Sequence, residues 1–325
     1  MRLSRYRDDQ KQEWDDFVRR SKNGTFLFLR DYMDYHRDRF EDHSMMVRTQ
    51  GGQLVALLPA TRQGSTLASH RGLTYGGFVT DAAMKTPRML EVFGAAVETL
   101  RELGFTALEY KTVPHLYHQL PAEEDRYALF LARATVIRRG LLTVVVARDR
   151  PVAQERRVRG ARKARQNGLT VALSADLPAF WHLLTARLLA SHNARPVHTL
   201  EEIRSLQARF PDNIKLHACL TPNAEMVAGV AVYESPLVAH CQYIAASDQG
   251  RDLQALDLLF TELLAMQYAQ KPYFDFGTSD EDDGWRLNQG LVEQKEGFGA
   301  RAVVHDHYAI ELDRCDPGLF ARALS

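Results

Sequence analysis

Apolar strands and amphipathic helices alternate along most of the chain, which is the pattern of an α/β protein. Residues 240–246 are predicted to form an apolar strand and residues 247–251 a polar turn that contains a glycine. A helix is expected to begin at Asp252, because apolar residues follow at helical spacing and its carboxylate can cap the free amides of the first turn. A second strand is predicted at 273–276, and the Asn-, Gln- and Gly-rich residues 287–301 are predicted to form a loop.

The first hundred residues predict a similar order of elements. Strands are expected at 44–49 and 54–59, on either side of a two-glycine turn, and a further strand is expected at 106–111. Between them, a helix is predicted to start with Thr86 as its N-cap and a proline at the first helical position, and to end at Gly104.

A constant shift of 166 positions places the elements of the first half on those of the second. Glu109 then falls on Asp275, each as the one acid inside an apolar strand. The other matched pairs are Thr86 with Asp252, Leu90 with Leu256, Phe93 with Leu259, Val97 with Leu263, Trp14 with Phe180 and Phe17 with Leu183. The shift predicts two tandem copies of one α/β fold, and two unrelated α/β domains with helices of similar length are the alternative.

The length of the chain is sufficient for two domains, each with its own core. We expect an N-terminal domain at 1–150, a basic linker or helix at 151–165 and a C-terminal domain at 166–325. Six of the ten residues 156–165 are Lys or Arg. Such a run is either the solvated face of a helix that links the domains or a phosphate clamp facing the cleft between them, since Arg binds phosphate oxygens bidentately.

Charge and cysteine content narrow the class of protein. The sequence has 41 Lys and Arg against 41 Asp and Glu, so no overall field attracts nucleic acid or an acidic membrane. The three cysteines have no metal-ligand spacing, which predicts a reduced, intracellular protein without a metal. No apolar segment typical of a signal peptide begins the sequence, and no run of about 18 apolar residues occurs. We therefore expect a soluble, cytoplasmic protein that does not bind membranes.

The residues around the predicted strand at 273–276 carry a resemblance to a known family. Phe274-Asp275-Phe276-Gly277-Thr278, followed by Gly290-Leu291 and residues 294–299, resembles the second-domain signature of the FemAB-like transferases, which are tandem pairs of the GNAT acyltransferase fold. The resemblance implies an α/β (α+β) protein of two tandem GNAT-like domains, each a mixed sheet flanked by helices. Residues 69–77, 121–125 and 196–199 resemble a subgroup encoded with bacterial surface-polysaccharide genes.

This resemblance implies an N-acyltransferase that moves an acyl group from acyl-coenzyme A to the amine of a nucleotide-linked amino sugar, for O-antigen lipopolysaccharide or capsule synthesis. A FemAB-type transferase that uses aminoacyl-transfer RNA on a peptidoglycan precursor is the first alternative. The neutral net charge favours coenzyme A over RNA, whereas the basic run keeps RNA open. A non-catalytic ligand-binding protein is the second alternative, because Gln294 stands where the family has an aromatic residue before its lysine.

The predicted acyl-donor site is centred on the turn before the helix expected at Asp252, where GNAT enzymes grip the pyrophosphate of coenzyme A. Lys295, or a strand amide near Gln242 and Tyr243, is predicted to donate to the developing oxyanion. The complete set of predicted donor-binding residues is Gln242, Tyr243, Ser247, Gln249, Gly250, Arg251, Asp252, Asn288 and Lys295.

The acceptor amine must lose a proton, so the site requires a base with a pKa near the working pH. His70 is the first candidate because it precedes a Gly-rich segment where the backbone can approach a ligand closely. Asp275 and Glu109 are the next candidates, as acids inside apolar strands, and Lys295 completes the predicted catalytic set.

Acceptor-binding residues are predicted on loops at strand ends, where open α/β sheets bind ligands. The predicted set is Arg71, Tyr75, Tyr110, Lys111, His115, Tyr117, His118, His192 and His198, of which the last two rest on the family resemblance alone. A homo-oligomer is possible through exposed strands such as residues 303–310.

Overall fold

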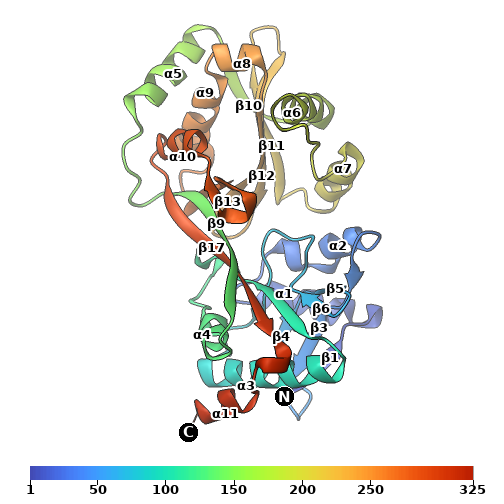
Figure 1. Ribbon diagram of the computed structural model, residues 1–325. Helices are drawn as coiled ribbons and strands as arrows, with labels where there is room; N and C mark the ends of the chain where they lie inside the picture. The colour runs from blue at the N-terminus through green and yellow to red at the C-terminus, as the bar shows by residue number, and fades with distance from the viewer. Residues whose placement is uncertain (325) are drawn as a thin grey trace. The chain divides into compact units, whose positions relative to one another are not determined.

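The computed structural model describes residues 1–324, apart from the side chains of His36, Ser191 and His192, and the chain divides into two compact units (Figure 1). Unit 1 consists of Met1–Gly140 together with Val304–Ser325, and unit 2 consists of Leu141–Val303. This division differs from the predicted boundaries, because the C-terminal segment returns to unit 1 and the basic run belongs to unit 2. In the described part of the chain, no helix is long and apolar enough to span a membrane.

Unit 1 contains two groups of paired strands. The first group is antiparallel, in the order β1 (Arg2–Arg5), β3 (Met45–Arg48), β4 (Leu54–Leu58) and β7 (Val79–Thr80). The second group has one parallel pair, β8 with β6, in the order β17 (Arg301–Glu311), β8 (Ala107–Lys111), β6 (Thr66–Ala68), β5 (Thr61–Gln63) and β2 (Glu41–Asp42). Because β17 pairs with β8, this edge of β17 is not available for the predicted pairing between subunits.

The longest helix of unit 1 supplies much of its core. The helices are α1 (Lys11–Arg20), α2 (Arg30–Met33), α3 (Thr86–Glu102), α4 (Glu124–Leu131) and α11 (Gly318–Arg322). Leu90, Phe93 and Val97 of α3 are buried, and the Phe93 ring lies 6.0 Å from the ring of Phe320 on α11. The C-terminal helix therefore completes the core of unit 1. Thr86 is the first helical residue rather than the N-cap, which is Lys85.

Unit 2 is built on a mixed sheet with helices on both faces. The strand order is β10 (Thr170–Ser174), β11 (Ile214–Leu220), β12 (Met226–Glu234), β13 (Val238–Ala246), β14 (Tyr273–Thr278) and β9 (Thr135–Val146), and only β13 and β14 are parallel. Helices α5 (Glu155–Gln166) and α9 (Ala255–Glu262) cover one face, whereas α6 (Leu177–His192) and α7 (Leu200–Arg209) cover the other (Figure 1). The predicted α/β class with mixed sheets is confirmed.

The two parallel strands of unit 2 diverge. β13 and β14 pair over three positions and the last pair is His240 with Asp275, although β13 continues to Ala246 and β14 to Thr278. The register of β13 against β12 also shifts at Gln242, which is an extra, bulged residue. The divergence leaves space between the carboxyl ends of two parallel strands, which is where α/β folds bind ligands.

The turn after β13 differs from the prediction. The N-cap is Ser247, whose Oγ accepts from the N–H of Gly250 at 3.0 Å, and the short helix α8 (Asp248–Asp252) follows it. Asp252 therefore ends a helix instead of capping one. Gln254 has a left-handed backbone (φ 60°), so the longer helix α9 begins only at Ala255 and is continued by a π-helical turn over Leu263–Gln267.

The predicted loop at 287–301 is wrong, because these residues contain helix α10 (Gln289–Glu296). Asn288 is its N-cap and accepts from the N–H of Leu291 at 3.0 Å. Asn and Gly favour loops in general, but here the Asn caps the helix and Gly290 is tolerated in its first turn. A two-stranded hairpin, β15 (Asp280–Glu281) with β16 (Arg286–Leu287), precedes α10.

Helix α5, predicted as a linker, is packed tightly against α9. A Cβ atom at Gly160 would lie 1.9 Å from Oδ2 of Asp257, so only glycine permits this approach. Beside it, Arg157 donates from Nη1 to Oδ1 of Asp257 at 2.7 Å, and both side chains are buried. The Arg157 guanidinium also lies 5.4 Å from the centre of the Phe298 ring. These contacts fix α5 to the body of unit 2.

Gly160→Ala is expected to lower the free energy of unfolding by about 1–3 kcal/mol, as overpacking of a core does. Alanine favours helix over glycine by about 1 kcal/mol, but the clash with the buried Asp257 outweighs that gain. Chemical denaturation measures the difference. Arg159→Ala, on the exposed side of the same helix, is the control and should change stability by less than about 0.5 kcal/mol. A variant at position 160 as stable as the wild type would contradict this packing.

Candidate active site

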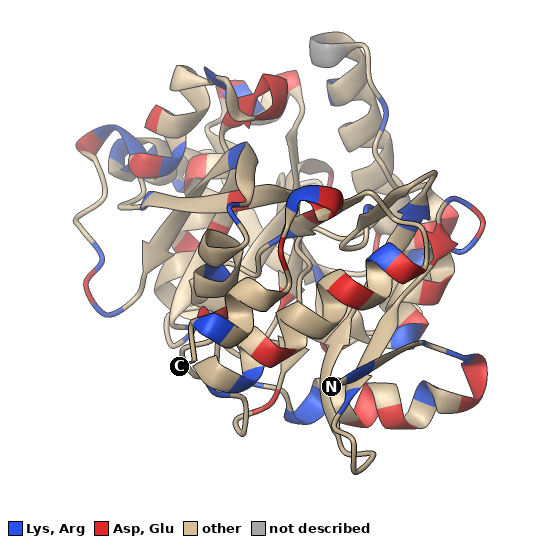
Figure 2. Ribbon diagram, turned by 60° about the horizontal axis from the view of Figure 1, so that its bottom comes forward, with Lys and Arg blue, Asp and Glu red and all other residues tan. Residues whose placement is uncertain are grey.

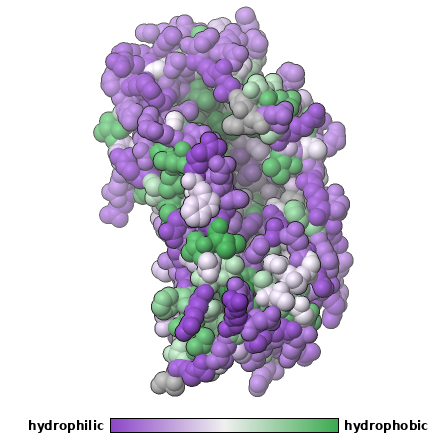
Figure 3. Space-filling model, viewed as in Figure 1, coloured by the Kyte–Doolittle hydropathy of each residue, from purple (hydrophilic) through white to green (hydrophobic). Residues whose placement is uncertain are grey.

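A cavity of about 480 Å³ lies in unit 2 where β13 and β14 diverge. Its walls come from the ends of β13 and β14, from α8 and α9, and from α5, α6 and α10. Figure 3 shows apolar side chains lying inside a hollow whose rim is hydrophilic. The apolar lining residues include Leu188, Ile244, Leu256, Phe260, Phe276, Leu291 and Phe298.

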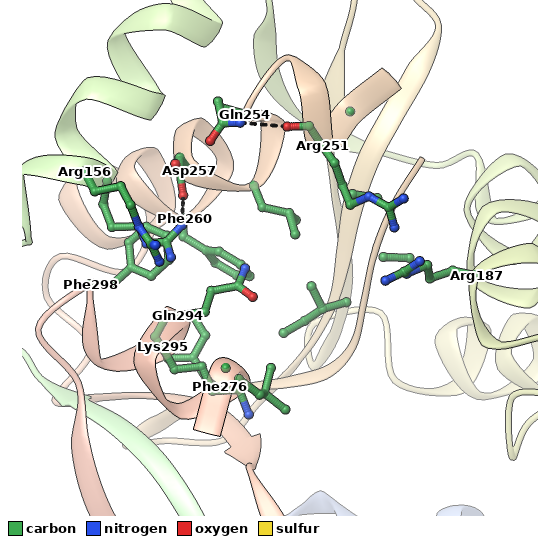
Figure 4. Close-up of a pocket in the computed structure, with 18 of the residues that line it drawn as sticks. Arg156, Arg187, Arg251, Gln254, Asp257, Phe260, Phe276, Gln294, Lys295 and Phe298 are labelled. Carbon is green, nitrogen blue, oxygen red and sulfur yellow. Dashed lines mark hydrogen bonds and ion pairs between the residues drawn. The ribbon is translucent and has the colours of Figure 1, made fainter. Parts of the chain in front are cut away.

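The charged residues that line the cavity are mostly basic. Figure 4 shows Arg187 and Arg251 pointing toward each other across its mouth, with Arg156 on the other side. The one acidic lining residue among those described, Asp257, is paired with Arg157. Burial raises the pKa of Asp257, and the hydrogen bond from Arg157 opposes that rise. Lys and Arg are otherwise interspersed with Asp and Glu along the chain (Figure 2), so the excess at the cavity is local.

This arrangement suits a ligand with an anionic end and an apolar body. Arginine guanidinium groups bind phosphate oxygens bidentately, and the apolar interior accommodates an uncharged chain. Arg251 pairs with Asp248 on the same short helix, so an anion at the mouth would compete with that carboxylate. Gly250 is required by packing, because a Cβ there would lie 2.1 Å from the carbonyl oxygen of Val227.

Lys295 of α10 lines the cavity but its amine is held by the end of β14. Nζ donates to the carbonyl oxygens of Gly277 at 3.1 Å and Thr278 at 2.6 Å, and to Oγ of Ser279 at 2.9 Å. Burial lowers the pKa of Lys295 to about 8, although nearby Asp275 opposes this. The amine thus holds the backbone of β14 where the strand has left β13.

His240 and Asp275 meet at the point of divergence. Nδ1 of His240 lies 2.8 Å from Oδ2 of Asp275, and Oδ1 of Asp275 accepts from the N–H of Gly277 at 2.8 Å. The Asp275 side chain is 1% exposed and the His240 side chain 12%. A carboxylate this deeply buried needs such partners, since it has left water.

Two predicted residues on the α6 side of the sheet are in contact. The hydroxyl of Tyr243 hydrogen-bonds Nδ1 of His198, and the Tyr243 ring lies edge-on to Trp181 at 5.2 Å. The Trp181 indole donates to the carbonyl of His198 at 3.1 Å. Burial raises the pKa of Tyr243 to about 12. The prediction for the side chain of His192 falls outside the described residues.

Unit 1 brings the other predicted residues near its Gly-rich segment. His70 is buried with a left-handed backbone (φ 43°), and Arg71 pairs with Glu109 at 2.6 Å. Nζ of Lys111 donates to the carbonyls of His70 at 3.2 Å and Leu73 at 2.7 Å. Burial, with Arg138 and Arg71 nearby, lowers the pKa of Lys111 to about 8.

The aromatic candidates of unit 1 are largely occupied by structural contacts. Tyr110 accepts from the N–H of Phe78 at 2.7 Å and donates to Asp125 at 2.8 Å. Tyr75 contacts the Tyr117 ring at 4.6 Å. His118 bonds the carbonyl of Val113, and burial lowers its pKa to about 4; His115 is exposed. The neighbouring glycines serve packing, since a Cβ at Gly77 would lie 2.7 Å from the Tyr110 hydroxyl oxygen.

Only some of the predicted donor-binding residues lie at the cavity. Gly250, Arg251 and Lys295 line the cavity, whereas the remaining predicted residues do not: Gln242, Tyr243, Ser247, Gln249, Asp252 and Asn288. Residues 1–324, with the side chains excepted above, contain no group of three or more His, Cys, Asp or Glu placed to hold a metal ion.

The polar residues of the site that were not predicted from the sequence include Arg156, Arg187, His240 and Gln294. Arg156 was visible only as part of the basic run, and Arg187 is a single charge inside an apolar helix. Gln294 lines the cavity at the position where the family resemblance leads one to expect an aromatic residue. His240 lies 35 residues from Asp275, and only the parallel pairing of β13 with β14 brings them together.

Residues 152–283 match the family described as Acetyltransferase (GNAT) domain. The predicted acyltransferase activity is thereby confirmed, and GNAT domains in general bind acyl-coenzyme A. No curated protein matches the sequence.

Solved structures resemble the whole chain in fold. The crystal structure of FemX has a TM-score of 0.65 at 13% identity and covers 94% of this chain and 97% of its own. L-PGS from Bacillus licheniformis has a TM-score of 0.61 at 12% identity and covers 100% and 97%. A tandem GNAT protein from the clavulanic acid biosynthesis pathway has a TM-score of 0.51 at 13% identity, covering 97% and 99%. The predicted FemAB-like fold of two tandem GNAT-like domains is confirmed.

The buried amine of Lys295 predicts a pH-dependent stability. Its pKa of about 8 is below the ordinary value of about 10.4, so between these pH values the unfolded chain holds a proton that the folded chain has lost. The free energy of unfolding of the wild type should therefore rise relative to Lys295→Met as the pH increases from 8 to 10, by at most about 1.4 kcal/mol per pH unit. Urea denaturation at several pH values measures this. Gln294→Met is the uncharged control, and a Lys295→Met difference that does not vary with pH would contradict the assignment.

Proposed function

We propose that this protein is an N-acyltransferase that moves an acyl group from acyl-coenzyme A to the amine of a nucleotide-linked amino sugar. The observation that carries the donor half is the cavity at the divergence of β13 and β14, apolar inside and arginine-rich at its mouth. Arg187 and Arg251 would hold the pyrophosphate, and the apolar interior would take the pantetheine arm. Each hydrogen bond to a charged phosphate contributes about 1.5–3 kcal/mol.

The proposed reaction is a direct transfer without a covalent enzyme intermediate. Orientation of two bound substrates can provide roughly 7–11 kcal/mol of the barrier, more than any one side chain. An oxyanion donor contributes about 2.7–4 kcal/mol, and the strand amides near the bulge at Gln242 can fill that role. Lys295 then acts mainly by fixing β14, since its amine already donates to two carbonyls and a hydroxyl.

The acceptor half of the proposal depends on the resemblance to transferases encoded with surface-polysaccharide genes. Unit 1 supplies side chains suited to a nucleotide sugar, among them Arg71, Lys111 and the exposed His115. Charged and aromatic groups of this kind bind phosphates, sugar hydroxyls and bases. These residues of unit 1 are therefore candidates for acceptor binding, and unit 2 carries the proposed donor site.

An aminoacyl-transfer RNA donor is the second candidate, and one surface feature favours it. Arg156, Arg159 and Arg162 recur every three residues along α5 and are exposed, so they form a basic stripe that begins at the cavity. A stripe of this kind can follow a nucleic-acid backbone. The equal numbers of acidic and basic residues in the chain favour the smaller donor.

Thermal-shift measurements with coenzyme A, acetyl-coenzyme A, a nucleoside diphosphate and bulk transfer RNA separate these candidates. A ligand at one hundred times its dissociation constant stabilises the folded protein by about 2.7 kcal/mol. We expect stabilisation by coenzyme A and by the nucleotide, and Arg251→Ala should lose only the response to coenzyme A. Arg162→Ala, on the same basic stripe but outside the cavity, is the matched control and should retain it.

Two other outcomes would contradict the proposed donor. Stabilisation by transfer RNA without a response to coenzyme A would favour the aminoacyl transferase, especially if Arg162→Ala weakened it. A coenzyme A response unchanged in Arg251→Ala and in Arg187→Ala would mean that coenzyme A binds elsewhere.

A further inference from the structure

We propose that His240 and Asp275 form a catalytic dyad in which Nε2 of His240 accepts the proton of the attacking amine. The inference rests on the proposed acyl transfer and adds a general base that neither the sequence nor the comparisons assign. Asp275 is the positioning residue of the pair, since it acts through the imidazole.

The first observation is the hydrogen bond that orients the ring. Oδ2 of Asp275 lies 2.8 Å from Nδ1 of His240, and its other oxygen is fixed by the N–H of Gly277 at 2.8 Å. An ionised carboxylate can only accept, so Nδ1 carries the proton and Nε2 is left with a lone pair. Among the described residues, none is a hydrogen-bond partner of Nε2. The ring is therefore set in the tautomer that a general base needs.

The second observation is that the ring lies beside Gly277. A Cβ at this position would lie 3.5 Å from Cε1 of His240, and the backbone there is left-handed (φ 76°). The carbonyl of the same glycine accepts from Nζ of Lys295. Gly277 of β14 therefore hydrogen-bonds both Asp275 and Lys295, and it also lies beside the imidazole of His240.

The third observation is the position of the dyad in the sheet. His240 and Asp275 are the last paired residues before β13 and β14 separate. The next residue on β14, Phe276, lines the donor cavity, and neighbouring side chains on a strand point to opposite faces. The dyad and the cavity therefore flank the same gap from its two sides. An amine bound on the face of the sheet that carries His240 would reach a thioester in the cavity through the gap, where β13 and β14 no longer pair.

The chemistry balances with these groups alone. The amine nitrogen forms a bond to the thioester carbonyl carbon, and the electron pair of the C–S bond leaves on sulfur. The amine proton passes to Nε2 of His240, and the imidazolium then returns that proton to the thiolate. The products are the amide and the free thiol, and the imidazole is neutral again.

Other titratable groups lie close to His240 and can also make the reaction rate depend on pH. Asp275 faces His240 from β14, and Tyr233 is its cross-strand neighbour on β12. Lys295 of α10 reaches the same segment of β14 through the carbonyl of Gly277. An effect of pH on the rate must therefore be assigned with variants at these positions as well as at His240.

Steady-state kinetics of the full-length protein with acetyl-coenzyme A and an amine acceptor test the dyad. His240→Gln is expected to lower kcat by roughly 10²–10⁴-fold, as loss of a general base does, with the KM for acetyl-coenzyme A little changed. The acid limb of the pH profile should disappear, and added imidazole should restore part of the activity of His240→Ala. Asp275→Asn should lower kcat in the same direction. His217→Gln, a buried histidine of β11 paired with Tyr268, is the matched control that should keep the wild-type profile.

The geometry can be tested without any substrate. Long-range proton–nitrogen NMR spectra of histidine-labelled protein should show neutral His240 protonated at Nδ1. Protonation at Nε2 would overturn the proposal, as would a His240→Gln variant with an unchanged kcat and pH profile. If the wild type showed no transfer from acyl-coenzyme A, the proposed donor would fail, and the NMR result would decide the dyad separately.

Discussion

The three-residue pairing of β13 with β14, which ends at His240 and Asp275, is the constraint on which the rest of unit 2 depends. Each strand is held on its other side, β13 by β12 and β14 by β9. The strands therefore cannot close again when they separate. Backbone groups that face the gap need other partners, because buried N–H and C=O groups are seldom left unpaired. Lys295 supplies two of these bonds, and the remaining opening is where an extended ligand with amide groups would fit.

A buried ion pair fixes the position of the basic helix α5 and therefore of its exposed arginines. Arg157 is paired with Asp257 beneath the helix, and Gly160 lets α5 approach closely enough for that contact. Breaking one partner of a buried pair typically costs about 3–5 kcal/mol, so the position of the helix is firmly set. Arg156 is thereby presented to the cavity while Arg159 and Arg162 remain exposed to solvent. The helix-face interpretation of the run therefore holds for Arg159 and Arg162, whereas Arg156 lines the cavity of unit 2.

Hydrophobic periodicity predicted the strands of the site, because apolar residues repeat at the spacing of each element. The tandem fold was predicted from the constant shift of 166 positions and from the family resemblance. The family motif predicted the region that contains Lys295 and Asp275. Predictions from local sequence were wrong where one residue type occurs both in loops and as a helix cap. Asn288 caps α10 instead of lying in a loop, and Ser247 rather than Asp252 is the cap after β13. Contacts between distant residues could not be predicted, and the pair of His240 and Asp275 depends on the parallel register of two strands.

The gap between β13 and β14 is the proposed binding site of the acyl donor. A crystal structure of the protein with coenzyme A tests it most directly. We expect the pantetheine arm between Ile244 of β13 and Phe276 of β14, with the pyrophosphate between Arg187 and Arg251. Coenzyme A bound elsewhere, with this cavity empty at a saturating concentration, would contradict the account.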